Sequence, residues 1–134
     1  MNLDELKLSL IEPKTQVIVF GKDGPMLNSC QSMEDISAFI NSSLYDLDPL
    51  FKSMERLIEG MHTKSDPIFI PCVEFDFFGR KGFFDFQISV HPDYPDLRAW
   101  LAIDNSSVYR YYQKIQQQRN ELLMEKETRS KKAG

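Results

Sequence analysis

Glu74, Asp76 and Asp85 are the residues whose types and spacing come nearest to an acid–base site. A hairpin turn at residues 79–82 would bring Asp76 near Asp85, on the sheet face opposite the phenylalanines. Catalytic carboxylates need a pocket that perturbs their pKa values, whereas this alternation places the acids on a solvated face. The sequence has no Ser-His-Asp order, no metal-spaced His/Cys cluster and no phosphate-binding glycine loop. We therefore expect no enzyme activity, no catalytic residue and no metal in this domain.

The two cysteines, Cys30 and Cys72, lie far apart in the sequence and form no CxxC motif. This usage indicates reduced thiols in the cytosol, although a disulfide between the two stays open. Cys72 lies among Ile70, Val73 and Phe75, which predicts a small residue packed in a sheet. Neither thiol is expected to carry chemistry.

Aromatic residues recur at alternate positions of two predicted strands and could line a cavity beneath two predicted helices. The candidate ligand-binding residues are Phe39, Met54, Leu57, Ile58, Phe75, Phe84 and Phe86. The same side chains, together with Phe69 and Phe77, could equally fill a solid core, which is the ordinary state of a protein interior. An unknown small molecule is therefore an open alternative to a packed core.

The composition is that of a single globular domain. At 134 residues, with 42% hydrophobic residues, the chain is long enough to bury a proper core. Nucleic-acid binders usually present a basic face, so the net charge of −4 argues against nucleic acid. No apolar run reaches the length of a membrane span, and the N-terminus lacks the features of a signal peptide. We expect a cytoplasmic domain without direct membrane insertion.

The elements that must position these residues follow one another in a clear order. Each long strand has one apolar face that needs a cover, and two helices are available to provide it. We expect an α+β fold, with a five-stranded antiparallel sheet, helices on one face and flanking helices at both ends. The predicted elements are a helix at 3–11 with Leu3, Leu6 and Leu10 on one side, a hairpin at 16–30, helices at 33–46 and 49–62, a three-strand meander at 68–103, and a long helix after 105.

The last strand passes directly into the long helix. Its apolar residues, Leu97, Ala99, Leu101 and Ile103, are predicted to share one face. Residues 104–107 then supply short polar side chains that can cap the free N–H groups of the helix. A shift of the sheet should therefore be transmitted to the helix.

The long helix carries a stripe with alternating spacings of four and three, the rhythm of a coiled-coil seam. Its members are Val108, Tyr112, Ile115, Arg119 and Leu122. Arg119 is the exception, because a buried cation costs stability unless it is paired. It could fix the register of two helices, or it could reach water along its stem where the coiled coil frays. The stripe predicts a homodimer.

This element order resembles that of PAS sensor domains over residues 14–127. The strand end Trp100-Leu-Ala-Ile-Asp104, followed by Asn-Ser-Ser, resembles the Asp-Ile-Thr-like motif that begins the family's signalling helix. Asn105 departs from it, since the family usually has Ile or Val there. Residues 109–121 resemble the linker helix of PAS domains in bacterial sensor histidine kinases. The resemblance implies a signal junction at Trp100, Asp104, Asn105 and Ser106.

The resemblance also implies a function in signal transduction. The domain would dimerise and couple a stimulus or small ligand to an output domain of its own parent chain, such as a bacterial histidine kinase of a two-component system. It divides the chain into an N-terminal flanking helix at 1–12, a PAS-like domain at 13–104, a signalling helix at 105–127 and a polar tail at 128–134. A small α+β enzyme or ligand carrier with a pocket between sheet and helices stays open as an alternative, as does a ligand-free dimerisation module.

No cofactor is expected. Haem-binding PAS domains have an axial histidine on a helix comparable to 49–62, but His62 precedes a polar segment and is expected to be exposed at the helix end. Flavin-binding relatives carry a photoactive cysteine in an Asn-Cys-Arg-type motif on a helix. The segment Asn28-Ser-Cys-Gln31 lacks that motif and is predicted to lie in a strand.

Overall fold

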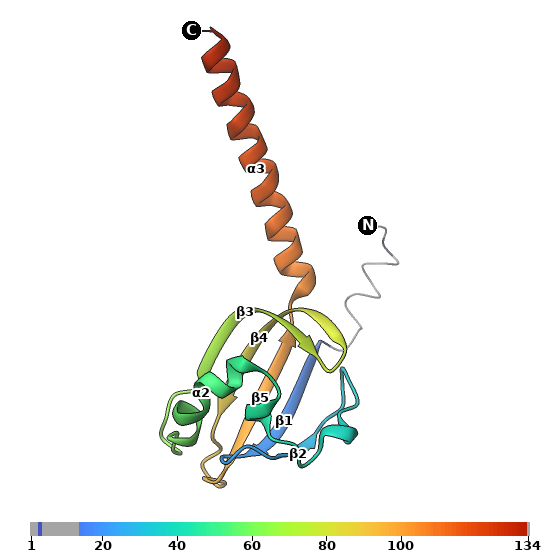
Figure 1. The fold of residues 1–134 in the computed structure, drawn as a ribbon, viewed down its shortest axis with the longest axis vertical. Helices are drawn as coiled ribbons and strands as arrows, with labels where there is room; N and C mark the ends of the chain where they lie inside the picture. Colours follow the sequence, from blue (N-terminus) through green and yellow to red (C-terminus); the bar gives the residue numbers. More distant parts are fainter. Residues whose placement is uncertain (1–2, 4–13, 134) are drawn as a thin grey trace.

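The computed structural model describes residue 3 and residues 14–133. A sheet with a helical cover forms the body of the molecule, and one long helix projects from it (Figure 1). The predicted helix at 3–11, with Leu6 and Leu10, lies outside the described residues apart from Leu3.

Five strands form one antiparallel sheet in the order β2-β1-β5-β4-β3. The last strand in the sequence, β5, therefore lies at the centre, and β3 and β2 form the edges. The strands are β1 (Thr15–Gly21), β2 (Met26–Ser29), β3 (Ile68–Phe77), β4 (Arg80–Ser89) and β5 (Leu97–Asp104). The predicted α+β fold and five-stranded antiparallel sheet are confirmed.

One α-helix, α2 (Pro49–Glu59), covers the inner face of the sheet together with two short 3₁₀ turns (Figure 1). Asp48 caps its start by accepting a hydrogen bond from the Leu50 amide at 2.9 Å. Pro49 follows at the first helical position, where its missing N–H costs nothing. Local sequence signals therefore fix where this helix begins.

The predicted helix at 33–46 is wrong, because the segment forms only the 3₁₀ turns η1 (Ser37–Phe39) and η2 (Leu44–Asp46). Nε2 of the buried Gln16 donates a hydrogen bond to the carbonyl of Glu34 at 2.9 Å. The backbone of Met26 pairs with residues 41 and 42. These long-range bonds hold backbone groups that a helix would have paired locally.

Aromatic rings fill the space between α2 and the sheet. Trp100 is fully buried, and its ring centroid lies 4.7 Å from that of Phe51, 5.1 Å from that of Phe86 and 5.4 Å from that of Phe77. Phe84 stacks on Phe86 with centroids 6.1 Å apart. Such ring pairs add to the stability that burial of their area provides.

The predicted inner face of β5 is the wrong one. Arg98, Trp100 and Ala102 are buried, whereas the apolar residues of the alternate positions are only half-buried on the outer face. Trp100 pairs with Ile18 of β1 and Ile88 of β4, which both point into the core. Because strand faces alternate, burying the large indole turns the smaller aliphatic side chains outward.

A β-bulge between Ile70 and Val73 divides the edge strand β3. Its one extra residue reverses the face that the strand presents, so Phe69 is 58% exposed while Phe75 and Phe77 stay inside. Phe69 was predicted to share their face. The backbone at Cys72 has a φ of +54°, a left-handed conformation, within this bulge.

The long helix α3 (Ser106–Ala133) begins directly after β5 and has 28 residues, or about 42 Å of length. It continues past residue 127, so residues predicted as a polar tail are helical up to 133. Every described side chain from Arg110 to Thr128 is exposed. Among the described residues, no helix is long and apolar enough to cross a membrane.

Candidate functional site

The junction between β5 and α3 is organised by the carboxylate of Asp104. Its Oδ1 accepts hydrogen bonds from the amide and hydroxyl of Ser106, at 2.9 and 2.5 Å, and so caps the helix. Its Oδ2 accepts from Arg80 Nε at 2.8 Å, at the start of β4. Burial acts to raise the pKa of Asp104, but the bonds from Ser106 and Arg80 outweigh it and hold the pKa below its ordinary value.

Ser106 also ties the helix to β4. Its Oγ accepts a hydrogen bond from the Phe83 amide at 3.0 Å, and the Phe83 carbonyl accepts from the Asn105 amide at the same distance. A Cβ built on the neighbouring Gly82 would collide with Ser106 Oγ. Glycine at position 82 therefore lets the first turn of α3 approach the strand backbone.

Asp85 of β4 forms a second cluster of hydrogen bonds on the outer face. Its Oδ1 accepts from the Cys72 amide at 2.9 Å and from Tyr109 Oη at 2.5 Å, and its Oδ2 accepts from Asn105 Nδ2 at 2.5 Å. Burial acts to raise the pKa of Asp85, but these three donors lower it overall. The hydrogen bond to Asp85 raises the pKa of Tyr109 to about 12.

Glu74 and Asp76 are exposed as predicted, but the predicted proximity of Asp76 to Asp85 and the solvation of Asp85 are corrected by this geometry. Asp76 lies opposite Lys81 in the strand register and not beside Asp85, because the hairpin turns at residues 78 and 79. Asp85 is only 9% exposed, instead of solvated. Its partners all belong to the bulge of β3 or to the helix start, which makes it a structural anchor for α3.

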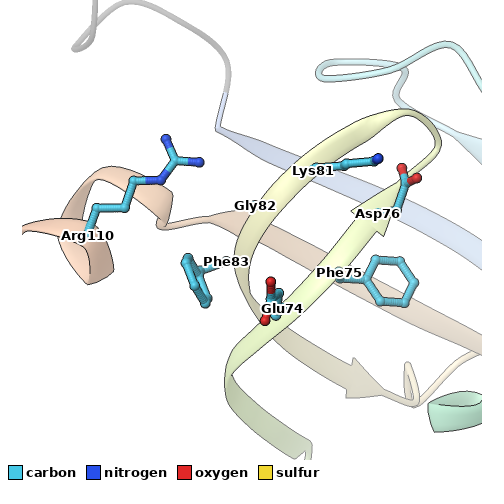
Figure 2. Close-up of a pocket in the computed structure, with 7 residues that line it drawn as sticks. All are labelled: Glu74, Phe75, Asp76, Lys81, Gly82, Phe83 and Arg110. Atoms are coloured by element: carbon cyan, nitrogen blue, oxygen red, sulfur yellow. The ribbon is translucent and has the colours of Figure 1, made fainter. Parts of the chain in front are cut away.

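Glu74 and Asp76 lie beside an open hollow of about 310 Å³ between the outer face of the sheet and α3 (Figure 2). Figure 2 shows Arg110 on the first turns of α3, with Phe83 of β4 between it and Glu74 of β3. The hollow is lined by Glu74, Phe75, Asp76, Lys81, Gly82, Phe83 and Arg110. Its acids and bases are exposed, so water screens their interactions strongly.

Arg98 is the residue that sequence reasoning missed. It is 1% exposed, and it donates hydrogen bonds to the carbonyls of Ile58 at 3.0 Å, Met61 at 2.8 Å and Pro95 at 2.7 Å. A further bond reaches Glu59 O at 3.3 Å, so the guanidinium closes the C-terminal end of α2. The only signal in the sequence is the alternation itself, which puts Arg98 on the same face as Trp100.

The fold has a counterpart among solved structures. The PAS domain of an HTR-like protein from Haloarcula marismortui superposes with a TM-score of 0.53, covering 76% of this chain and 99% of that one, at 14% identity. The chain has the PAS fold. The PAS domain of Bordetella pertussis BvgS gives a TM-score of 0.48 at 17% identity, over 86% of this chain and 98% of that one. No protein-family model and no curated protein matches the sequence.

The candidate ligand residues do not come together in one site of this PAS fold. Ile58, Phe75, Phe84 and Phe86 are buried and Met54 is half-buried, but Phe39 is 38% exposed and Leu57 is 60% exposed. Leu57 faces away because α2 buries the stripe through Phe51 and Ile58. Trp100 belongs to the packed core instead of the junction, and its Nε1 has no hydrogen-bond partner among the described residues.

The remaining candidate residues lie at the surface of the PAS fold. All five seam residues of α3 are exposed: Val108, Tyr112, Ile115, Arg119 and Leu122. His62 is exposed, and its Nδ1 accepts a hydrogen bond from the Lys64 amide at 3.3 Å. Cys30 and Cys72 are exposed free thiols. Within residues 3 and 14–133, no group of three or more His, Cys, Asp or Glu is placed to hold a metal.

Proposed function

We propose that this PAS-fold domain is a sensory signal-transduction module that passes a change in its sheet to α3. The observation that carries the proposal is the path of β5. It lies at the centre of the sheet and continues into α3 through the cap formed by Asp104 and Ser106. Arg80 holds the same carboxylate from β4, so the helix start is fixed to two strands at once.

The polar residues of the junction support a mechanical role instead of a chemical one. Both carboxylate oxygens of Asp85 and of Asp104 accept hydrogen bonds that hold the start of α3. A catalytic acid or base needs an oxygen or proton within reach of a substrate. Coupling, not catalysis, is therefore the role that we propose for this site.

The exposed stripe on α3 supports a dimer. Val108, Tyr112, Ile115 and Leu122 leave apolar surface open to solvent at the spacing that two supercoiled helices bury. We propose a parallel homodimer in which α3 pairs with α3 of a second copy. The paired helices would carry a rotation or register shift to an output domain of the parent chain, such as a histidine kinase.

The stimulus is proposed to act on the sheet from outside. The rings around Trp100 occupy the inner face, where a small ligand would otherwise lie. A neighbouring domain that touches an exposed edge of the sheet would need no cavity. A small molecule found by native mass spectrometry in the purified protein would instead favour a ligand sensor.

Sedimentation of the wild-type chain and of Ile115→Asp tests the dimer. A carboxylate in the seam would be desolvated on pairing, and we expect the dissociation constant to rise at least 30-fold, or about 2 kcal/mol. Gln113→Asp is the matched control, because it adds the same charge off the stripe and should leave assembly unchanged. A monomeric wild type at high concentration, or unchanged assembly of Ile115→Asp, would contradict the proposal.

A further inference from the structure

Asp85 is the point at which the edge strand, the β5–α3 connection and the helix itself meet. The Cys72 amide belongs to β3, Asn105 to the connection and Tyr109 to α3, and all three donate to this one carboxylate. At 9% exposure, Asp85 has little water available to replace a donor that moves away. Displacing any one partner must therefore disturb the other two.

The β3 bulge depends on Asp85 for its backbone pairing. An extra residue in one strand of a ladder leaves backbone groups unpaired, and here the carboxylate accepts the amide of Cys72. The bulge lies on an edge strand, whose free side is open to contact by a neighbouring domain. Pro71 and Cys72 are both exposed at this position. Movement here would change the geometry around Asp85 first.

On the helix side, Tyr109 makes the attachment. It lies in the first turn of α3, where its amide bonds to Asn105 O at 3.0 Å, and its ring packs on Phe83 with centroids 6.3 Å apart. Its hydroxyl reaches Asp85 without involving Asp104 or Arg80. The helix is thus held at two separate carboxylates, one on β5 and one on β4.

We propose that Asp85 couples the β3 bulge to α3, so that a contact on the edge strand reaches the helix without passing along β5. The inference rests on the proposed signalling role of α3 and adds a second input to it. A shift of β5 would act on α3 through the cap at Asp104, whereas a shift of the β3 bulge would act through the bond between Asp85 and Tyr109. A neighbouring domain at residues 70–72 could therefore act on α3 directly.

Residue-resolved hydrogen exchange tests the coupling in the intact chain. Tyr109→Phe removes one hydroxyl on α3, and the protection of the Cys72 amide on β3 should fall roughly three- to tenfold, since a charge-assisted bond at Asp85 is lost. Tyr111→Phe is the matched control, because it makes the same change on an exposed tyrosine outside the cluster. It should alter the Cys72 amide by less than about twofold.

Variants at Asp85 complete the test. Asp85→Ala should lower the protection of the Cys72 and Tyr109 amides together. Asp85→Asn keeps one oxygen for the Cys72 amide and the Tyr109 hydroxyl, but its own NH2 faces Asn105 Nδ2, so it should preserve only part of this protection. An unchanged Cys72 amide in Tyr109→Phe would overturn the coupling. An equal loss of protection at Ile18 in β1 would also overturn it, because it indicates global unfolding. A monomer in sedimentation would overturn the proposed dimer and leave this exchange result standing.

Discussion

Replacing the buried Arg98 with methionine should strongly destabilise the domain. Methionine fills much of the same volume but has no donors, so the carbonyls at the end of α2 lose their partners. Arg98 bonds Ile58 O and Met61 O inside the protein, and it bonds Pro95 O nearer the surface. These contacts join the helical cover to β5, so their loss loosens the cover as well as the strand.

The expected cost follows from the two buried carbonyls. A buried polar group that loses its hydrogen bond costs about 1–3 kcal/mol. Ile58 O keeps a hydrogen bond from the Met61 amide at 3.2 Å, so it loses only one of its two donors. At Pro95 O, a water molecule can take the place of the guanidinium. We therefore expect the free energy of unfolding to fall by about 2–4 kcal/mol. That is a large share of the roughly 5–15 kcal/mol that stabilises a typical domain.

Urea denaturation followed by tryptophan fluorescence measures this change directly, because Trp100 is the only tryptophan and lies in the core. Arg56→Met is the control, since it removes an exposed cation from α2 and should cost less than about 1 kcal/mol. The reasoning would be refuted by an Arg98→Met protein within about 1 kcal/mol of the wild type, because the carbonyls would then not depend on the guanidinium.

Two further predictions concern the junction. Gly82→Ala should push Ser106 off β4 and destabilise the domain by about 1–3 kcal/mol, and adding Ser106→Gly should restore part of this loss in the same urea assay. Ultraviolet titration of the tyrosines should show two late groups near pH 12, Tyr109 and Tyr45, and Tyr109→Phe should remove one of them. Because the pKa of Tyr109 rises from 10 on folding, its hydrogen bond stabilises the fold fully below pH 10 and is lost as the pH rises through 12.

Much of the fold could be predicted because its signals are local. Asp48 and Pro49 mark the start of α2 through their own backbone chemistry, and the alternation in β4 places Phe84 and Phe86 inside as expected. The helix predicted at 33–46 does not form. It fails because distant residues bind backbone groups that the helix would have paired within itself: Gln16 Nε2 donates to Glu34 O, and Met26 pairs with residues 41 and 42.

The junction was predicted in part. Asp104 and Ser106 form the expected cap, since an acceptor two residues before a free amide is a short-range pattern. The role of Asp85 could not be found in this way, because the bulge in β3 decides which amide lies opposite it. Sequence alternation assigns residues to faces and partners by counting along the strand. The extra residue at Cys72 therefore shifts every later pairing of β3 with β4.

The face reversal of β5 has a consequence for coupling. Arg98, Trp100 and Asp104 all occupy even positions of the strand and so share its inner face. Arg98 holds the end of α2, Trp100 packs in the aromatic core, and Asp104 caps α3, over a span of about 20 Å. Had the aliphatic residues faced inward, the strand would have offered α2 no donor. With the observed face, α2 and α3 are bonded to opposite ends of β5. A shift of α2 should therefore displace β5, and with it the start of α3.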